Sequence, residues 1–372
     1  MGEYKPKLST PIGRWAAVGP YYAMFPLDFA FEVIENYSKP GELVVDPFAG
    51  RASSIYAAAT KGRHGLGIEI NPLGWIYAQT KLNPAPLRDV ENRFRAIVKA
   101  SEREKYIELT KDLPEFFRWC YSKDILAFLL AARNLLNWRK NRVDRTLMSF
   151  ILVYLHGKLG QNLSNQMRQS KAMGPIYSVR WWKERKMRPP QLDIKDFLLH
   201  RIRWRYEMGF PQITSSKVKM ADSSKVLKKE VEAFEGEIGK RCSLFFTSPP
   251  YSGLTNYHKD QWLRLWMLGG EESPLWVSEK HKGRFDSQVE YKELLESVFS
   301  AASEIMDDTG TVYVRTDTRD FTKTTTLEIL RKYFPDWNEK IVEAPVTSKT
   351  QTIVLGNTSS KQGEVDIILT KK

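Results

Sequence analysis

The sequence contains only two cysteines, Cys120 and Cys242, among 372 residues. Two isolated thiols exclude a disulfide framework and offer no cysteine cluster for zinc, so we expect a reducing compartment and a site without metal. The sequence also lacks an apolar run of the roughly 20 residues that a membrane span needs. Its first ten residues contain no apolar segment of the kind found in signal peptides. These absences predict a soluble protein of the cytoplasm.

Acidic residues are scarce in one part of the chain. Residues 131–210 hold 17 Lys and Arg against 5 Asp and Glu, a net charge of +12, whereas the other 292 residues sum to +1. A positive field confined to one segment suits a polyanion. A solvated basic surface is the alternative, but tryptophans lie among these cations, and exposed faces rarely carry several indoles. The segment is predicted to bind nucleic acid through Arg180, Trp181, Trp182, Arg185, Arg188, Arg201, Arg203 and Arg205.

Near the start of the chain, the pattern predicts alternating helices and buried strands. A helix from about residue 25 to Tyr37 is followed by apolar runs at 43–45 and 66–68, which end in Asp46 and Glu69. A glycine-containing turn and an alanine-rich helix separate the two strands. This β-turn-α-β unit, with an acidic residue closing each strand, is typical of a nucleoside cofactor site in a doubly wound sheet.

Residues 84–210 lose the strand signal. Helices are predicted at about 89–103, 114–137, 145–160 and 192–208, with a long basic loop at 161–191. The α/β pattern then resumes, with strands at 217–220, 244–246, 311–315, 340–345, 351–355 and 364–370 and helices at 224–236, 261–268, 289–306 and 323–334. We therefore predict a discontinuous catalytic domain of residues 1–83 and 211–372, interrupted by a mainly helical insertion of residues 84–210.

A rigid turn follows the apolar run 244–246 and contains Ser248, Pro249, Pro250 and Tyr251. The prolines fix φ and remove two backbone donors, so the carbonyls of Ser248 and Pro249 have no competing local donor. Stacking of a base on Tyr251 would contribute about 1–3 kcal/mol. Because ligands bind at the carboxyl ends of such strands, the turn is predicted to hold a planar base that carries an amino group. A simple strand end with a core tyrosine is the alternative.

Four motifs together resemble those of the DNA amino-methyltransferases, which use S-adenosylmethionine. They are Asp46-Pro47-Phe48-Ala49-Gly50, Glu69-Ile70-Asn71-Pro72, Ala221-Asp222-Ser223 and Thr247-Ser248-Pro249-Pro250-Tyr251. The resemblance covers roughly residues 20–82 and 217–370 and leaves out the insertion. It implies an α/β fold with a doubly wound, mostly parallel, Rossmann-like sheet of seven strands and a large helical insertion. The Thr-Ser-Pro-Pro-Tyr form is most similar to the cytosine-N4 branch, since adenine-N6 members more often carry Asp or Asn before the prolines.

The resemblance also implies a cofactor site formed by Phe25, Asp46, Phe48, Ala49, Gly50, Glu69, Ile70, Asp222 and Thr247. In this site the glycine loop would wrap the methionine part of the cofactor, Glu69 would accept both ribose hydroxyls, and Asp222 would accept from the adenine amino group. Acids at strand ends also commonly cap the next helix, which is the alternative for these residues. Arg51-Ala52 replaces the usual Ser-Gly, and alanine disfavours positive φ, so we expect a different loop path or weaker cofactor binding.

For the reaction, the resemblance implies that Ser248, Pro249, Pro250 and Tyr251 are catalytic. A cytosine flipped out of double-stranded DNA would place its N4 protons on Ser248 Oγ and the Pro249 carbonyl, without a covalent enzyme intermediate. The insertion would recognise the DNA. The protein would act at the nucleoid, in the cytoplasm of a prokaryotic-type cell, and whether a partner restriction endonuclease exists is left open. Adenine-N6 specificity, an RNA base substrate and an inactive DNA-binding protein are the alternatives, the last supported only by Arg51-Ala52.

Overall fold

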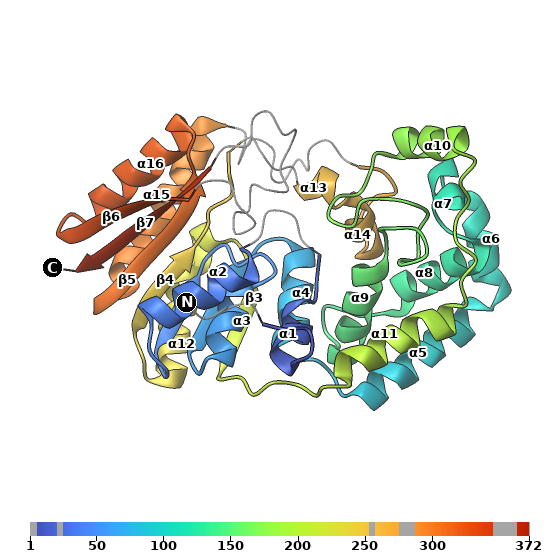
Figure 1. Cartoon of the computed structure of the whole chain (residues 1–372), viewed down its shortest axis with the longest axis horizontal. Helices are drawn as coiled ribbons and strands as arrows, with labels where there is room; N and C mark the ends of the chain where they lie inside the picture. Colours follow the sequence, from blue (N-terminus) through green and yellow to red (C-terminus); the bar gives the residue numbers. More distant parts are fainter. Residues whose placement is uncertain (1–5, 21–24, 253–256, 275–286, 345–362, 372) are drawn as a thin grey trace.

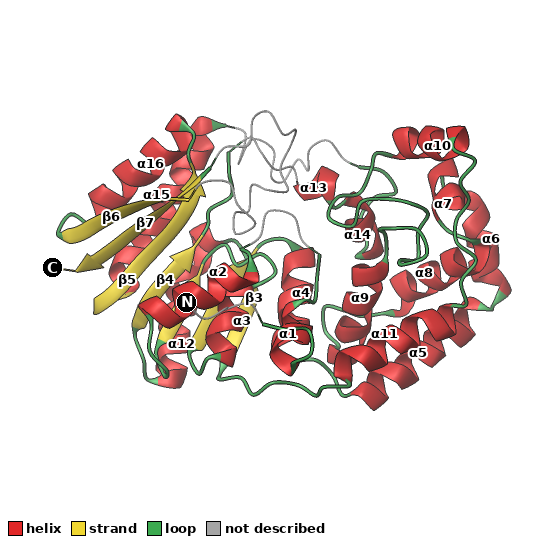
Figure 2. Ribbon diagram, viewed as in Figure 1, coloured by secondary structure: helices red, strands yellow, loops and turns green. Residues whose placement is uncertain are grey.

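A single mixed sheet of seven strands organises the chain in this computed structural model, which describes residues 6–20, 25–252, 257–274, 287–344 and 363–371 (Figures 1 and 2). The strand order is β3-β2-β1-β4-β5-β7-β6. The strands are β1 (Leu43–Asp46), β2 (His64–Glu69), β3 (Ser216–Met220), β4 (Cys242–Thr247), β5 (Met306–Asp317), β6 (Trp337–Ala344) and β7 (Glu364–Lys371). Neighbours from β3 to β5 pair in parallel, and β7 is antiparallel to both of its neighbours. The predicted fold class is confirmed; the strand predicted at 351–355 lies outside the described residues.

Helices cover both faces of this sheet (Figure 2). Side chains alternate across each strand, so Val44 and Phe246 pack on one face and Val45 and Phe245 on the other. The first face packs against α2 (Leu27–Tyr37), α3 (Ser53–Thr60) and α4 (Pro72–Leu82). The second face packs against α12 (Ser223–Ile238), α15 (Gln288–Ile305) and α16 (Asp320–Tyr333). This two-sided burial explains the continuous apolar runs of the central strands.

The insertion is helical and shares the core of the first sheet face. Its helices are α5 (Leu87–Ser101), α6 (Glu104–Asp112), α7 (Glu115–Cys120), α8 (Lys123–Leu135), α9 (Arg142–Tyr154), α10 (Pro175–Glu184) and α11 (Ile194–Tyr206). Trp15, in the short N-terminal helix α1 (Pro11–Ala16), packs against Tyr206 at the end of α11. Its indole Nε1 donates to the Gly209 carbonyl at 2.9 Å. Within the described residues, no helix is both long and apolar enough to cross a bilayer.

Two predictions about the insertion are wrong. The helix predicted over 114–137 is broken between α7 and α8, because Asn165 from a distant loop takes the carbonyls at the end of α7: its backbone N donates to Cys120 O at 2.7 Å and its Nδ2 to Trp119 O at 3.1 Å. The loop predicted over 161–191 contains α10, which begins after Gly174 with Pro175 in its first turn. That proline is the helix-start signal that the basic composition obscured.

The chain that follows β4 joins the insertion. Helices α13 (Tyr257–Asp260) and α14 (Trp262–Met267) lie between the sheet and α7 in Figure 1. The indole of Trp266 packs on the Phe117 ring with centroids 4.6 Å apart. A shared core therefore connects the segment after the Ser248 turn to the basic helices.

Candidate functional site

The predicted acidic residues lie at the carboxyl ends of adjacent strands. The sheet order places the ends of β3, β2, β1 and β4 in a row. Thr247 Oγ1, at the end of β4, donates to Asp46 Oδ1 at the end of β1, at 2.8 Å. Ala221 N, just after β3, donates to the Glu69 carbonyl at 3.1 Å. The structure thus brings the four sequence motifs together at one edge, although they are up to 201 positions apart in the chain.

Asp46 holds the turn after β1 in place. Its carboxylate accepts from Ser54 Oγ at 2.5 Å and from Phe48 N at 3.0 Å, in addition to Thr247. Burial raises the pKa of Asp46 to about 6, and the three hydrogen bonds lower it in part. A buried carboxylate with these donors connects β1, β4 and the start of α3, so Asp46 fixes the geometry of the loop that follows it.

Glu69 closes the same loop from β2. Its carboxylate accepts from Gly50 N and Asn71 N, both at 2.6 Å. Burial raises its pKa to about 7, the backbone hydrogen bonds lower it, and the nearby Asp46 carboxylate raises it further. A carboxylate has about four lone-pair sites, so acceptor capacity is left at Glu69 for a hydroxyl donor such as those of a ribose.

The loop that joins β1 to α3 contains two residues with positive φ. Gly50 has φ 53° and Ala52 has φ 58°, and Ala52 N donates to the Ala49 carbonyl at 2.6 Å. Opposite the loop, Gly74 of α4 allows close contact, because a Cβ there would lie 2.6 Å from the Gly50 carbonyl oxygen. Alanine therefore adopts the conformation that glycine favours, at a conformational cost of roughly 1–2 kcal/mol.

An Ala52→Gly variant is expected to be almost as stable as the wild type. Relief of the left-handed strain offsets the lost methyl burial and the greater freedom of glycine in the unfolded chain, leaving a net change within about 1 kcal/mol. Ala58, equally buried but inside α3, is the matched control. Ala58→Gly should cost about 2 kcal/mol, because a helical glycine and a lost methyl both destabilise. Urea unfolding of both variants measures the difference, and equal losses would contradict the strain argument.

Three further predicted cofactor residues occupy different environments. Asp222 caps α12, accepting from Ser224 N at 3.1 Å and Ser224 Oγ at 2.7 Å, so the capping alternative holds for this acid. Ile70 is 36% exposed beside Glu69. Phe25 is buried and stacks on Phe246 with centroids 4.6 Å apart, which places it against β4 within the core.

In the turn after β4, Ser248 has an unusual environment. Its hydroxyl oxygen is buried beside the Tyr251 hydroxyl and has no well-aligned hydrogen-bond partner within the described residues. Pro249 is buried and Pro250 half-buried, so the turn is packed as well as rigid. Leaving a buried hydroxyl unpaired costs about 1–3 kcal/mol, and such cost is commonly tolerated where a ligand completes the bonding.

Tyr251 is only 3% exposed, so its ring is packed and does not present the open stacking face that the sequence suggested. Its hydroxyl donates to Glu364 Oε1 at 3.1 Å. Burial, and then the charge of Glu364, raise the pKa of Tyr251 well above its usual range, while the neighbouring Ser248 hydroxyl and Arg315 lower it. The tyrosine therefore stays protonated and anchors the turn to β7.

That anchor belongs to a buried network which the sequence analysis missed. Arg315 Nη1 lies 3.4 Å from Glu364 Oε2, and its guanidinium binds Asp366 through Nε and Nη2 at 2.6 and 2.7 Å. Tyr313 donates to the same Asp366 at 2.8 Å. The signal was present, because charged residues alternate with apolar ones on two strands that otherwise read as buried. A bidentate pair of this kind rigidifies the sheet next to the Ser248 turn.

The predicted DNA-binding residues divide by burial. Arg180, Arg185 and Arg188 are exposed. The guanidinium of Arg185 lies 4.5 Å from the half-buried Trp181 ring. Arg188 stacks in the same way over Trp119 at 4.6 Å. Stacking leaves the edge of a guanidinium able to donate, although Arg180 and Arg185 both lie within 4 Å of Glu184, with which a phosphate would compete.

Trp182 and Arg205 do not belong to this surface. Trp182 is fully buried, and its Nε1 donates to the Gln166 carbonyl at 2.8 Å. Arg205 is 3% exposed and donates to the Arg14 carbonyl. The prediction that these two residues contact DNA is wrong, because both serve the core of the insertion.

Two further arginines on α11 make internal contacts. The Arg201 guanidinium lies 3.6 Å from the Phe197 ring centroid, and Arg203 Nε pairs with Glu91 Oε1 at 2.6 Å. Arg203 is exposed and Arg201 is half-buried. A DNA phosphate would have to compete with Glu91 for Arg203, so α11 is the weaker part of the predicted interface.

Comparison with known proteins connects this edge of the sheet to a family. Residues 3–73 match the DNA methylase family model, a span that includes Asp46, the glycine loop and Glu69. A stretch of 49 residues, 13% of this chain and 14% of the relative, is 39% identical to the type II methyltransferase M.MthZI of Methanothermobacter thermautotrophicus. Both matches are similarities to methyltransferases, and each covers a small part of this chain.

Solved methyltransferase structures are similar at low sequence identity. The rRNA methyltransferase aviRa from Streptomyces viridochromogenes is 11% identical with a TM-score of 0.35, over 96% of this chain and 90% of that one. SMU.776, a putative methyltransferase complexed with SAH, is 9% identical with a TM-score of 0.34, over 94% of this chain and 50% of that one. The fold assignment rests on the sheet order, and the match to the DNA methylase model supports S-adenosylmethionine as the cofactor.

Proposed function

We propose that this chain transfers the methyl group of S-adenosylmethionine to the exocyclic N4 amine of a cytosine flipped out of double-stranded DNA. The observation that carries the proposal is the buried Ser248 hydroxyl in a rigid Pro-Pro turn, which lies beside Tyr251 and has no well-aligned hydrogen-bond partner in the part of the chain that the structure describes. It directly follows Thr247, whose Oγ1 binds Asp46 of the cofactor edge. An acceptor is thus held next to the place where a sulfonium methyl is expected.

The geometry supports specific roles for the chain's own residues. Glu69 would hold the ribose, and the loop at Gly50 would hold the methionine part; when bound, the cofactor supplies an electrophilic methyl. Ser248 Oγ and the Pro249 carbonyl would accept the two N4 protons of the base, which directs the nitrogen lone pair away from the ring. Orienting the amine in this way contributes through proximity rather than through a covalent intermediate.

The surroundings of the turn protect this arrangement. Tyr251 is bound to Glu364, Glu364 pairs with Arg315, and Arg315 also binds Asp366, so the turn has a fixed position relative to β5 and β7. A preorganised acceptor costs no rearrangement at the moment of reaction. Exposed cations at Arg180, Arg185 and Arg188 would bind the DNA backbone on the insertion side.

An adenine-N6 substrate is the second candidate, since the family match covers both kinds of amino-methyltransferase and ends before the Ser248 turn. Ser248 favours cytosine, because the residue in front of the prolines is a hydroxyl rather than a carboxylate or an amide. The proposal also includes a prokaryotic-type setting, with a cognate restriction endonuclease as a partner to be tested.

The test is to incubate the protein with S-adenosylmethionine carrying a labelled methyl group and unmethylated genomic DNA, and to analyse the hydrolysed nucleosides by mass spectrometry. We expect labelled N4-methylcytosine. Labelled N6-methyladenine would overturn the base assignment, and label that enters only RNA in a parallel reaction would overturn the DNA substrate. Heat-treated protein is the control for non-enzymatic transfer.

A further inference from the structure

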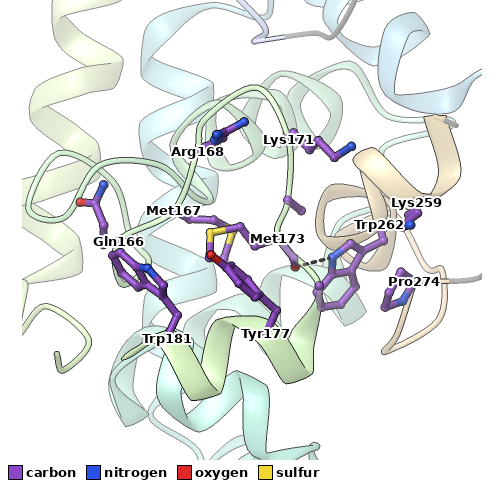
Figure 3. Close-up of a pocket in the computed structure, with 12 residues that line it drawn as sticks. Gln166, Met167, Arg168, Lys171, Met173, Tyr177, Trp181, Lys259, Trp262 and Pro274 are labelled. Carbon is purple, nitrogen blue, oxygen red and sulfur yellow. Dashed lines mark hydrogen bonds between the residues drawn. The ribbon is translucent and has the colours of Figure 1, made fainter. Parts of the chain in front are cut away.

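The insertion contains a pocket that neither the cofactor site nor the catalytic turn uses. It has a volume of about 460 Å³, within the range of small-molecule sites, and lies between α10, the loop at 166–174 and the α13–α14 segment (Figure 3). Figure 3 shows Tyr177 and the sulfurs of Met167 and Met173 at its centre, with Arg168 and Lys171 along one side. The pocket therefore combines a flat apolar lining with cations.

Its walls are held in place by the protein itself. The loop at 169–173 is pinned to α13 and α14 by four hydrogen bonds: Ala172 N to Asp260 O at 2.8 Å, Gln261 Nε2 to Ser170 O at 2.8 Å, Trp262 Nε1 to Met173 O at 3.2 Å and Arg264 Nη2 to Gln169 O at 2.6 Å. Arg264 is fully buried, so it serves the wall and not the ligand. A pocket with walls fixed in this way is formed before any ligand arrives.

The lining matches one kind of chemical group. Tyr177 is 51% exposed, and its ring together with the two methionines offers a face for a planar ring. Arg168 is exposed at the same pocket. Lys171 is bound to Asp260 at 2.6 Å, and Lys259 completes the basic side. A planar base with a phosphate attached satisfies both parts, and the insertion's surplus of positive charge favours a polyanion over a neutral ligand.

We propose that this pocket binds one unpaired nucleotide of the DNA substrate, with its base on Tyr177 and its phosphate at Arg168. The proposal rests on the proposed function for the identity of its ligand. The position agrees with it, because α13 and α14 are the first helices after the Ser248 turn, and they form one wall. A nucleotide held here would keep a neighbouring stretch of the duplex open while the target base occupies the catalytic turn.

The test measures binding without requiring methyl transfer. Fluorescein-labelled duplexes, one fully paired and one with a single-nucleotide bulge, are titrated with the full chain and followed by anisotropy. The wild type is expected to prefer the bulged duplex roughly 10-fold, in line with the stacking of one base. Tyr177→Ala should abolish this preference, and Tyr177→Phe should keep it, because the phenylalanine ring retains the stacking face.

The charged part of the pocket has its own control. Arg168→Ala should weaken binding of the bulged duplex severalfold more than Arg103→Ala, which removes the same charge from an exposed position of the insertion outside the pocket. A bulge preference that survives Tyr177→Ala, equal effects of the two arginine variants, or tighter binding of the corresponding RNA would each overturn the proposal. If the protein does not methylate DNA but shows the Tyr177-dependent preference for the bulged duplex, the proposed function alone is overturned. If it methylates DNA without that preference, the proposed nucleotide binding in the pocket alone is overturned.

Discussion

Ser248→Ala is expected to lower the rate of methyl transfer roughly 100- to 1000-fold, the loss typical when one preorganised partner of the transition state is removed. The reason is that Ser248 Oγ is buried and has no well-aligned hydrogen-bond partner in the described residues, so in the proposed reaction it would accept a proton of the substrate amine. Removing a poorly paired buried hydroxyl should change the free energy of unfolding by no more than about 1 kcal/mol. Single-turnover methylation and thermal unfolding measure the two effects.

A second serine on β4 provides a matched control for Ser248→Ala. Ser243, near the opposite end of the same strand, points its hydroxyl to the Arg241 carbonyl at 3.4 Å. Ser243→Ala should leave methyl transfer within about twofold of the wild type, since the residue lies away from the carboxyl edge. Affinity for S-adenosylhomocysteine should be unchanged in both variants. Retention of methyl transfer by Ser248→Ala would remove Ser248 from the mechanism and with it the main support for the proposed reaction.

Glu69→Gln is expected to lower the affinity for S-adenosylhomocysteine roughly 10- to 100-fold at pH 8. This is the range expected for losing hydrogen bonds to a charged acceptor. Glu69 accepts from Gly50 N at 2.6 Å, so the amide would also disturb the loop that surrounds the ligand. Isothermal titration gives the affinity directly. Glu42→Gln, just before the opposite end of β1, is the control and should bind as the wild type does.

The pH dependence of cofactor binding follows from the same carboxylate. Burial raises its pKa to about 7, and in the proposed site the ionised form would be the better acceptor for the ribose hydroxyls. Wild-type affinity should therefore rise about 10-fold from pH 6 to pH 8 and then level off, while Glu69→Gln should show a flat profile. A wild-type profile as flat as that of the variant would exclude Glu69 as the titrating group.

Folding stability should respond to the same group in the opposite direction. The folded-state pKa of Glu69 lies above its ordinary value of 4.5, so the folded state holds the proton more tightly than the unfolded state. The contribution of Glu69 is present below pH 4.5 and is lost as the pH rises to about 7. Asp46, whose pKa is raised to about 6, adds to this trend. Opposite slopes for stability and cofactor affinity distinguish a ligand-binding carboxylate from a purely structural one.

Local pattern was sufficient to predict the edge of the sheet. The apolar runs ending in Asp46, Glu69 and Thr247 are strands in the structure, and their ends lie side by side. Such strands can be read from sequence because a segment buried on both faces must be continuously apolar. The left-handed conformation at Ala52 could not be read in this way, since the surrounding turn imposes it against the preference of alanine.

Which polar residues face solvent was decided by tertiary packing. Trp182 and Arg205 belong to the same basic stretches as Arg185 and Arg203, and nothing local separates the buried pair from the exposed pair. The difference arises because distant carbonyls, those of Gln166 and Arg14, are there to accept from them. Burial of a polar side chain depends on a partner, and the partner is a property of the whole fold.

The sequence by itself determined the fold class, the order of the motifs and the charge of the insertion, because these depend on periodicity and composition along the chain. Only the tertiary structure brought Tyr177 of α10 and Lys259 of α13, 82 positions apart, to one pocket, and Tyr251 to Glu364, 113 positions away. Long-range contacts of this kind are set by how the helices and strands pack on one another, and sequence periodicity reports only which face of each element is apolar.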